Sequence, residues 1–234
     1  MIVLALDTAT SATVVGLRAA DGTIREARDD VEPGTRPRHT QRLLPFAAGL
    51  LAEAGLRFED LDLIAVGIGP GTFTGLRIGI ATARGLAQAT GAPVVGLCTL
   101  RVLATAADAA QTSTTHRPPT PVLALIDAGR GEAFVGGYER GREVVAPAPV
   151  GPDGLAAVAE GRAWVGVGSG ALRFRGQLED ANVAVAPDES PLHRVSAATM
   201  LGLALDDDVD ARAPVTPLYL RLPDAELALR STRP

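Results

Sequence analysis

The segment from Val66 to Arg84, VGIGPGTFTGLRIGIATAR, constrains the fold more than any other part of this chain. It joins an apolar strand to a helix through a loop with four glycines and two threonines: Gly67, Gly69, Gly71, Gly75, Thr72 and Thr74. Glycine lets the backbone turn tightly and approach a bound group, and threonine caps free N–H groups where a helix begins. The loop is therefore either a tight strand-to-helix connection or an anion site at a helix N-terminus.

Two familiar phosphate-binding loops do not fit this segment. No Gly-Lys-Ser/Thr follows it, and its glycine spacing does not match a dinucleotide-binding unit. Gly75, Gly79 and Ala83 then recur at four-residue spacing, which leaves one helix face with almost no side-chain bulk. Such a face lets another helix approach closely, either within the fold or on a partner.

Composition limits what the chain can be. Its 234 residues form one large domain or two small ones, and 47% apolar with 3% aromatic residues predicts an aliphatic core. No apolar run is long enough to span a membrane, and the first residues read as a strand. The single Cys98 fits a reducing compartment, so we expect a cytoplasmic protein. The net charge of -5 argues against direct binding of nucleic acid.

The periodicity of apolar residues predicts an α/β chain. Strands are predicted at Ile2–Leu6, Thr13–Arg18, Ile24–Arg28, Leu61–Val66, Pro93–Leu97, Val122–Asp127, Ala133–Tyr138, Val144–Val145, Trp164–Val167 and Val183–Ala186. Helices are predicted at Arg38–Ala54, Gly75–Thr90, Leu100–Ala110, Asp153–Ala159 and Ser196–Leu205. The first three strands read as a β-meander, and Pro45 implies that the first helix starts near Leu44 or bends there.

The polar segment Gln111–Thr120 is a candidate boundary between two lobes. Both halves open with a strand that ends in aspartate, IVLALDTAT and PVLALIDAGR, which two related α/β lobes would explain. We therefore expect a first lobe over residues 1–110, completed by a helix near 195–206, a smaller second lobe over 111–194, and a tail over 207–234.

Asp7 closes the first strand and is followed by a hydroxyl-rich turn. With the glycine loop it forms a candidate anion or nucleotide site made of Asp7, Thr8, Thr10, Gly69, Gly71, Thr72 and Thr74. The alternative is a turn in which these side chains bond the local backbone. Asp127 has the same two interpretations. The three histidines, His39, His116 and His193, show no metal-binding spacing, so no metal site is expected.

Five segments occur in the order of a known family: IVLALDTATSATVVGL, RHTQRLLP, GIGPGTFTGLRIGIATARGLA, DAGRGEAF and VTPLYLR. On these the chain resembles, nearly end to end, the TsaB (YeaZ) family of non-catalytic subunits of the bacterial tRNA threonylcarbamoyladenosine machinery. The resemblance implies an actin/Hsp70/sugar-kinase architecture of two ribonuclease-H-like lobes. It also implies that catalysis belongs to the paralogue TsaD, whose HxxxH metal pair falls here on Thr99 and Leu103, neither a useful ligand.

The same resemblance implies that function lies at the surface of the first lobe. Two helices, Arg38–Ala54 and Gly75–Thr90, would pack against the equivalent helices of TsaD, with contacts from His39, Leu43, Gly75, Leu76, Gly79, Ile80 and Ala83. It further implies TsaE as a third subunit, self-association without TsaD, contact with tRNA only through the complex, and no tightly bound cofactor, though ATP or ADP could sit at the complex interface. The alternatives are an independent ATP-dependent kinase or acyltransferase using Asp7 and the Gly69–Thr74 loop, and, less favoured, a peptidase.

Overall fold

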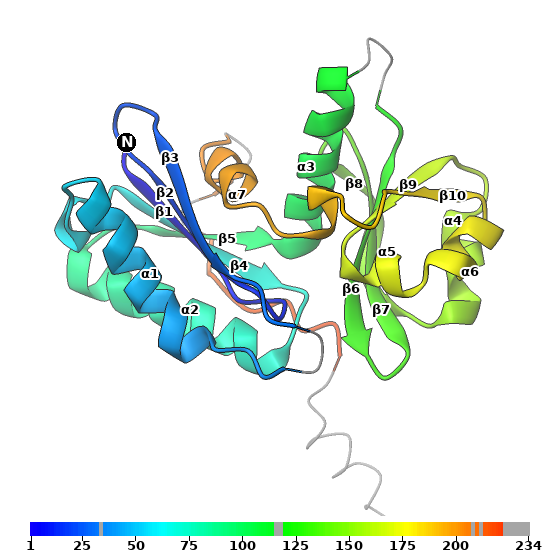
Figure 1. Ribbon diagram of the computed structural model, residues 1–234, viewed down its shortest axis with the longest axis horizontal. Helices are drawn as coiled ribbons and strands as arrows, with labels where there is room; N and C mark the ends of the chain where they lie inside the picture. Colours follow the sequence, from blue (N-terminus) through cyan, green and yellow to red (C-terminus); the bar gives the residue numbers. More distant parts are fainter. Residues whose placement is uncertain (33–34, 115–118, 207–208, 211–212, 222–234) are drawn as a thin grey trace, which may run out of the picture.

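A computed structural model describes residues 1–32, 35–114, 119–206, 209–210 and 213–221. These residues form two five-stranded sheets that lie in two lobes, with the N-terminal sheet in one and the later strands in the other (Figure 1). No helix in the described ranges is both long and apolar enough to cross a membrane.

The first sheet has the strand order β3-β2-β1-β4-β5. Its strands are β1 (Val3–Asp7), β2 (Thr13–Arg18), β3 (Ile24–Asp29), β4 (Leu63–Gly69) and β5 (Val94–Cys98). The first three strands pair antiparallel, which confirms the predicted meander, and β4 and β5 continue the sheet parallel to β1.

The second sheet repeats this plan. Its order is β10-β9-β6-β7-β8, with β6 to β8 antiparallel and β9 and β10 parallel to β6. The strands are β6 (Val122–Gly129), β7 (Glu132–Glu139), β8 (Arg142–Val150), β9 (Trp164–Val167) and β10 (Val183–Val185). Since β6 takes the place of β1, both lobes have the ribonuclease-H-like arrangement, and the predicted actin/Hsp70/sugar-kinase fold class is confirmed.

Seven helices cover these sheets in the described part of the chain. They are α1 (His39–Glu53), α2 (Phe73–Thr90), α3 (Thr99–Thr114), α4 (Leu155–Ala159), α5 (Ser169–Arg173), α6 (Arg175–Asp180) and α7 (Ala197–Leu203). Single 3-10 turns lie at Phe58–Asp60, Pro152–Gly154 and Pro191–His193. The helices α1 and α2 lie side by side on one face of the first sheet, and α7 lies on the other face beside α3 (Figure 1).

The alternation along β1 explains how the first sheet is covered on both faces. Leu4 and Leu6 pack into the cluster under α1 and α2, whereas Val3 and Ala5 face the opposite way. That second cluster continues through α3 to strand β6, so one apolar core joins the two lobes. The helix α3 therefore fixes the second sheet against the first by burial of apolar surface.

Several boundaries differ from the prediction. The helix α1 runs from His39 to Glu53, which confirms the predicted range Arg38–Ala54, and it does not start near Leu44. Pro45 has no N–H to donate to the Gln41 carbonyl, but both residues are exposed, so water can take that hydrogen bond. The helix α3 reaches Thr114, into the segment expected to be a boundary, and the rest of that segment lies partly outside the described residues. Strand β8 is nine residues long where two were predicted, and α5 and α6 were not predicted.

Candidate functional site

Asp7 ends β1 in the interior of the first lobe. Its Oδ1 accepts a hydrogen bond from the backbone N–H of Ala9 at 3.0 Å, and the Thr99 hydroxyl lies 3.5 Å from Oδ2. A Cβ on Gly67 would lie 1.9 Å from the same Oδ2, so β4 closes around the carboxyl group. Burial raises the pKa of Asp7 to about 6, although the two hydrogen bonds lower it. The Asp7 side chain is fully buried and has no solvent-accessible surface.

The glycines of the loop are explained by contacts within this chain. A Cβ at Gly71 would lie 2.2 Å from the carbonyl oxygen of Ala9. At Gly75 it would lie 2.0 Å from the Thr8 carbonyl oxygen, and at Gly79 it would lie 2.5 Å from Thr8 Oγ1. The Thr8 hydroxyl donates to the Gly75 carbonyl at 2.7 Å. These glycines therefore let α2 press against the β1–β2 turn, and no bound group is needed to explain them.

The structure separates the predicted anion-site residues. Thr72 caps α2, accepting from the Gly75 N–H at 3.2 Å, as the sequence indicated. Asp7, Thr8 and Gly69 are buried, and Thr74 is exposed on the helix. Only Thr10 and Thr72 of that set line the cavity between the lobes. The predicted residues are thus not brought together around one accessible space.

A cavity of about 450 Å³ lies between the lobes. Its lining includes the carboxylates of Asp30, Glu32 and Asp127, against two arginines, Arg28 and Arg194. Asp127 is exposed on β6, and Arg173 donates to its two oxygens at 2.9 and 2.7 Å. This excess of carboxylates does not favour a phosphate group in the cavity.

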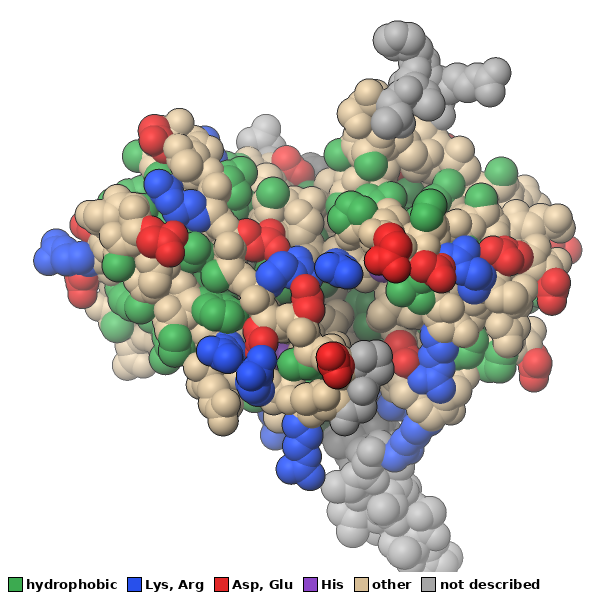
Figure 2. Space-filling view, viewed as in Figure 1, with side chains coloured by type: hydrophobic (Ala, Val, Ile, Leu, Met, Phe, Trp, Pro, Cys, Tyr) green, Lys and Arg blue, Asp and Glu red, His purple; other side chains and the backbone are tan. Residues whose placement is uncertain are grey.

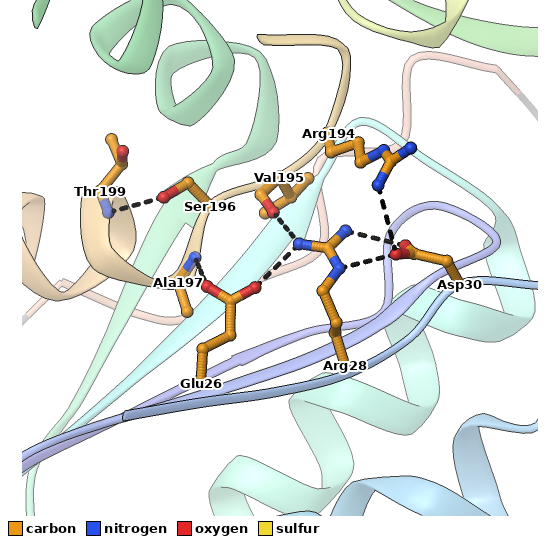
Figure 3. Close-up of polar contacts among 8 residues, drawn as sticks. All are labelled: Glu26, Arg28, Asp30, Arg194, Val195, Ser196, Ala197 and Thr199. Carbon is orange, nitrogen blue, oxygen red and sulfur yellow. Dashed lines mark hydrogen bonds and ion pairs between the residues drawn. The ribbon is translucent and has the colours of Figure 1, made fainter. Parts of the chain in front are cut away.

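The arginines at this cavity are engaged by neighbouring side chains (Figure 3). The Arg28 guanidinium donates to Glu26 and to Asp30, each at 2.8 Å, and to the Val195 carbonyl at 3.2 Å. Hydrogen bonds to Asp30 raise the pKa of Arg28 above its usual value. Arg194 lies 3.8 Å from the same Asp30 carboxylate. Figure 2 shows charged side chains of both signs gathered across the middle of this face.

The described histidines have structural surroundings. His39 is buried at the start of α1, with Nδ1 2.9 Å from Thr13 Oγ1 and Nε2 without a partner among the described residues, and burial lowers its pKa. The ring nitrogens of buried His193 lie 3.1 Å from backbone carbonyl oxygens. His116 lies outside the described residues. Within those residues, no group of three or more His, Cys, Asp or Glu is placed to hold a metal ion.

The residues predicted to contact a partner all lie inside the lobe. Buried positions are His39, Leu43, Gly75, Leu76, Gly79, Ile80 and Ala83. In the small-residue stripe of α2, Gly75 and Gly79 face Thr8 in the β1–β2 turn and Ala83 is buried, so the stripe is not exposed to a second protein in this conformation. The sequence could not show that these positions are buried, because glycine and alanine are compatible with either a packed or an exposed helix face.

The opposite, solvent-facing side of the two helices is unusual in another way, and we call it the outer face. Many of its residues are small or apolar: Leu44, Pro45, Ala48, Gly49 and Ala52 on α1, with Ala81, Gly85 and Ala89 on α2, and with Ile78 and Leu86 half-buried against the core beneath. Leu44 is 47% exposed, and Figure 2 shows apolar side chains at the surface over α1. A Cβ on Gly49 or Gly85 would meet no atom within 4 Å. Internal packing therefore does not explain Gly49 and Gly85. The sequence signal that could have located this face is the helical spacing of small residues on the exposed side of α1 and α2.

The chain is similar to a protein-family model and to several known proteins. A family model described as "TsaD: tRNA N6-adenosine threonylcarbamoyltransferase" matches residues 33–159, a range that includes α1 and α2. The uncharacterized protein Rv3421c of Mycobacterium tuberculosis is 36% identical over 225 residues, covering 96% of this chain and 93% of its own length.

A named relative is the tRNA threonylcarbamoyladenosine biosynthesis protein TsaB of Escherichia coli, 41% identical over 140 residues. That match covers 60% of this chain and 56% of the E. coli protein, and the chain likewise spans 56% of ML0378 of Mycobacterium leprae. The solved structure of YeaZ from Pseudomonas aeruginosa is 33% identical with a TM-score of 0.66, covering 87% of this chain and 91% of that one. The chain belongs to the TsaB (YeaZ) family.

Proposed function

We propose that this chain is a scaffold subunit in the synthesis of tRNA N6-threonylcarbamoyladenosine and that it binds TsaD through its outer face. The observation that carries the proposal is the pair of exposed helix glycines, Gly49 and Gly85, among alanines and aliphatic side chains. A glycine inside a helix costs about 1 kcal/mol relative to alanine. A partner helix that approaches closely at these positions offsets that cost.

The homology supports a helix-on-helix contact. The TsaD family model matches the part of this chain that contains α1 and α2, so the two proteins share this two-helix layer. Helices packed against each other lie about 8–10 Å apart, and small residues permit the shortest of these separations. A four-helix arrangement, with two helices from each protein, would bury the apolar residues of this chain's outer face.

The chemistry of the site supports assigning the group transfer to TsaD. The Asp7 carboxyl is enclosed, Thr99 and Leu103 stand in place of metal ligands, and the cavity arginines are paired. These features do not favour an independent kinase or acyltransferase. The net charge of -5 supports tRNA contact only through the complex. We keep TsaE as a third subunit, ATP or ADP at the complex interface, and a homodimer of the free chain as parts of this proposal.

The test is complex formation followed by activity. The purified chain and TsaD from the same organism should elute together in size-exclusion chromatography, and tRNA modification should require both. Gly85→Arg should abolish co-elution, because its side chain fills the approach space while meeting nothing in the free chain.

Gly176→Arg is the matched control, since Gly176 also lies on an exposed helix face with open space but belongs to α6 of the second lobe. Separate elution of the wild-type proteins at micromolar concentration would refute the scaffold role. Co-elution that survives Gly85→Arg would show that TsaD binds another face.

A further inference from the structure

An arginine at one edge of the outer face is held in place by two aromatic rings. The Arg77 guanidinium carbon lies 4.0 Å from the ring centroid of Phe73, and its Nε–H donates to Tyr219 Oη at 3.3 Å. The Phe73 and Tyr219 rings stack with centroids 5.0 Å apart. Arg77 is exposed, and Tyr219 is 39% exposed. These contacts use the flat face and the Nε atom of the guanidinium, and within the described residues neither Nη group donates a hydrogen bond.

The aromatic support comes from a segment far away in the sequence, residues 215–221, which we call the strap. Arg84 of α2 donates to the Val215 carbonyl at 2.7 Å, and the Leu218 N–H donates to the Ile68 carbonyl at 2.7 Å. At the other end, Arg221 donates to the Ala128 carbonyl in the second lobe at 2.9 Å. The strap is thereby fixed along the edge of α2, and Tyr219 is positioned beside Arg77.

The charge of this surface differs in sign from that of the chain. The helices α1 and α2 contain three arginines, Arg42, Arg77 and Arg84, against the single acid Glu53, whereas the whole chain carries -5. Arg42 lies 3.8 Å from Asp29. Among the described residues, no carboxylate lies within ion-pair distance of Arg77. A cation that is exposed, oriented and unpaired is suited to a charged group on a partner.

We propose that Arg77, positioned by Phe73 and Tyr219, receives a carboxylate side chain of TsaD at the edge of the interface, and this rests on the proposed function. A planar guanidinium offers two parallel N–H donors to a carboxylate, and stacking on Phe73 limits the rotation that binding would otherwise have to freeze. Arginine and tyrosine are also the residue types that dominate interface binding energy. Tyr219 acts through Arg77 and is a positioning residue.

The same observations disfavour two other occupants. A phosphate backbone is bound by several cations together, whereas Arg77 is one cation beside an apolar surface, and Arg84 already donates to Val215. A second copy of this chain could cover the apolar residues of the outer face, but its α1 and α2 offer Arg77 only one carboxylate, Glu53, so a homodimer would pair Arg77 less well than an acidic partner. A TsaD face that combines a carboxylate with apolar residues would pair with Arg77 and also cover the apolar residues of the outer face.

The experiment measures the affinity of the full-length chain for TsaD at low and high salt. Arg77→Leu should weaken binding at least tenfold in 50 mM NaCl, by less in 500 mM NaCl, and should leave the melting temperature unchanged. Arg77→Lys should recover only part of the affinity, because an ammonium group lacks the planar pair of donors. Tyr219→Phe should weaken binding a few-fold in the wild type but have no further effect in Arg77→Leu.

Arg142→Leu is the control, since Arg142 is an exposed arginine of β8 in the second lobe. Wild-type affinity of Arg77→Leu would overturn this inference and leave the proposed function standing, whereas failure of the wild-type pair to associate would overturn both. Unchanged TsaD affinity combined with weaker tRNA binding would identify a phosphate occupant and reject the carboxylate. Tighter self-association of Arg77→Leu with unchanged TsaD affinity would likewise reject it.

Discussion

At the scale of single residues, Asp7 shows how burial determines chemistry. An aspartate at a strand end beside a glycine loop is compatible with a phosphate-linked role, yet here the backbone of Ala9, the Thr99 hydroxyl and the approach of Gly67 enclose it. Its pKa is raised from 3.8 to about 6 because the ionised form loses its hydration. The folded state therefore carries an ionised, poorly solvated carboxylate at neutral pH, which reduces stability.

This predicts a pH-dependent effect of Asp7→Asn. Because the folded pKa lies above the unfolded one, folding takes up a proton between pH 3.8 and about 6, and stability present below pH 3.8 is lost as pH rises through 6. The full decrease in the free energy of unfolding from this one group is about 3 kcal/mol. In urea titrations Asp7→Asn should be more stable than wild type by about 1–3 kcal/mol at pH 8 and by less than about 1 kcal/mol at pH 4. An equal effect at both pH values would contradict this explanation.

At the scale of elements, α2 contains two glycines that differ in what surrounds them. A Cβ at Gly79 would lie 2.5 Å from Thr8 Oγ1, and a Cβ at Gly85 would meet nothing within 4 Å. Gly79→Ala should therefore lower the free energy of unfolding by about 1–3 kcal/mol through overpacking. Gly85→Ala should raise it by about 0.5–1 kcal/mol through helix propensity. Thermal or urea unfolding of each variant, without TsaD, measures whether the free energy of unfolding falls for Gly79→Ala and rises for Gly85→Ala.

A second substitution tests the cause of the Gly79 effect. Thr8→Ala removes the hydroxyl that the new methyl group would meet, so the double variant should lose less stability than the sum of the two single variants. Strict additivity would show that Thr8 is not the obstacle. Stabilisation by Gly79→Ala would place this face of α2 toward open space and restore it as a candidate partner surface.

The sequence predicted the existence of α2 but not its orientation. Leu76 and Ile80 mark the buried side, while Gly79 is compatible with either a packed or an open face. Contacts made by Thr8, distant in sequence, decide the question. The helices α5 and α6 are five and six residues long, too short to show a period, and β8 is a largely exposed strand with two prolines. Local patterns therefore predicted the well-buried elements, and tertiary contacts determined the others.

At the scale of the whole molecule, the chain crosses from the second lobe back to the first along residues 194–197, and β3 holds this crossing (Figure 3). Arg28 donates to the Val195 carbonyl, and Glu26 accepts from the Ala197 N–H at 3.1 Å, while Ser196 caps α7. The helix α7 then packs on β2, where a Cβ at Gly16 would lie 2.6 Å from the Ala197 side chain. Arg28 thus joins an edge strand of one lobe to the segment that leaves the other.

We expect Arg28→Met to loosen the lobes without changing the partner surface. Hydrogen exchange at Val195 and Ala197 should accelerate and small-angle scattering should give a larger radius of gyration, while TsaD affinity stays within twofold because the outer face lies wholly in the first lobe. Arg175→Met is the matched control: Arg175 is equally exposed and contacts two acids, Glu179 and Asp188, and the Ala186 carbonyl, all within the second lobe. Both variants remove a charged residue from an ion network, so general destabilisation affects both, and only Arg28→Met should change the scattering. Identical scattering from the two would mean that the α3 core alone sets the arrangement of the lobes.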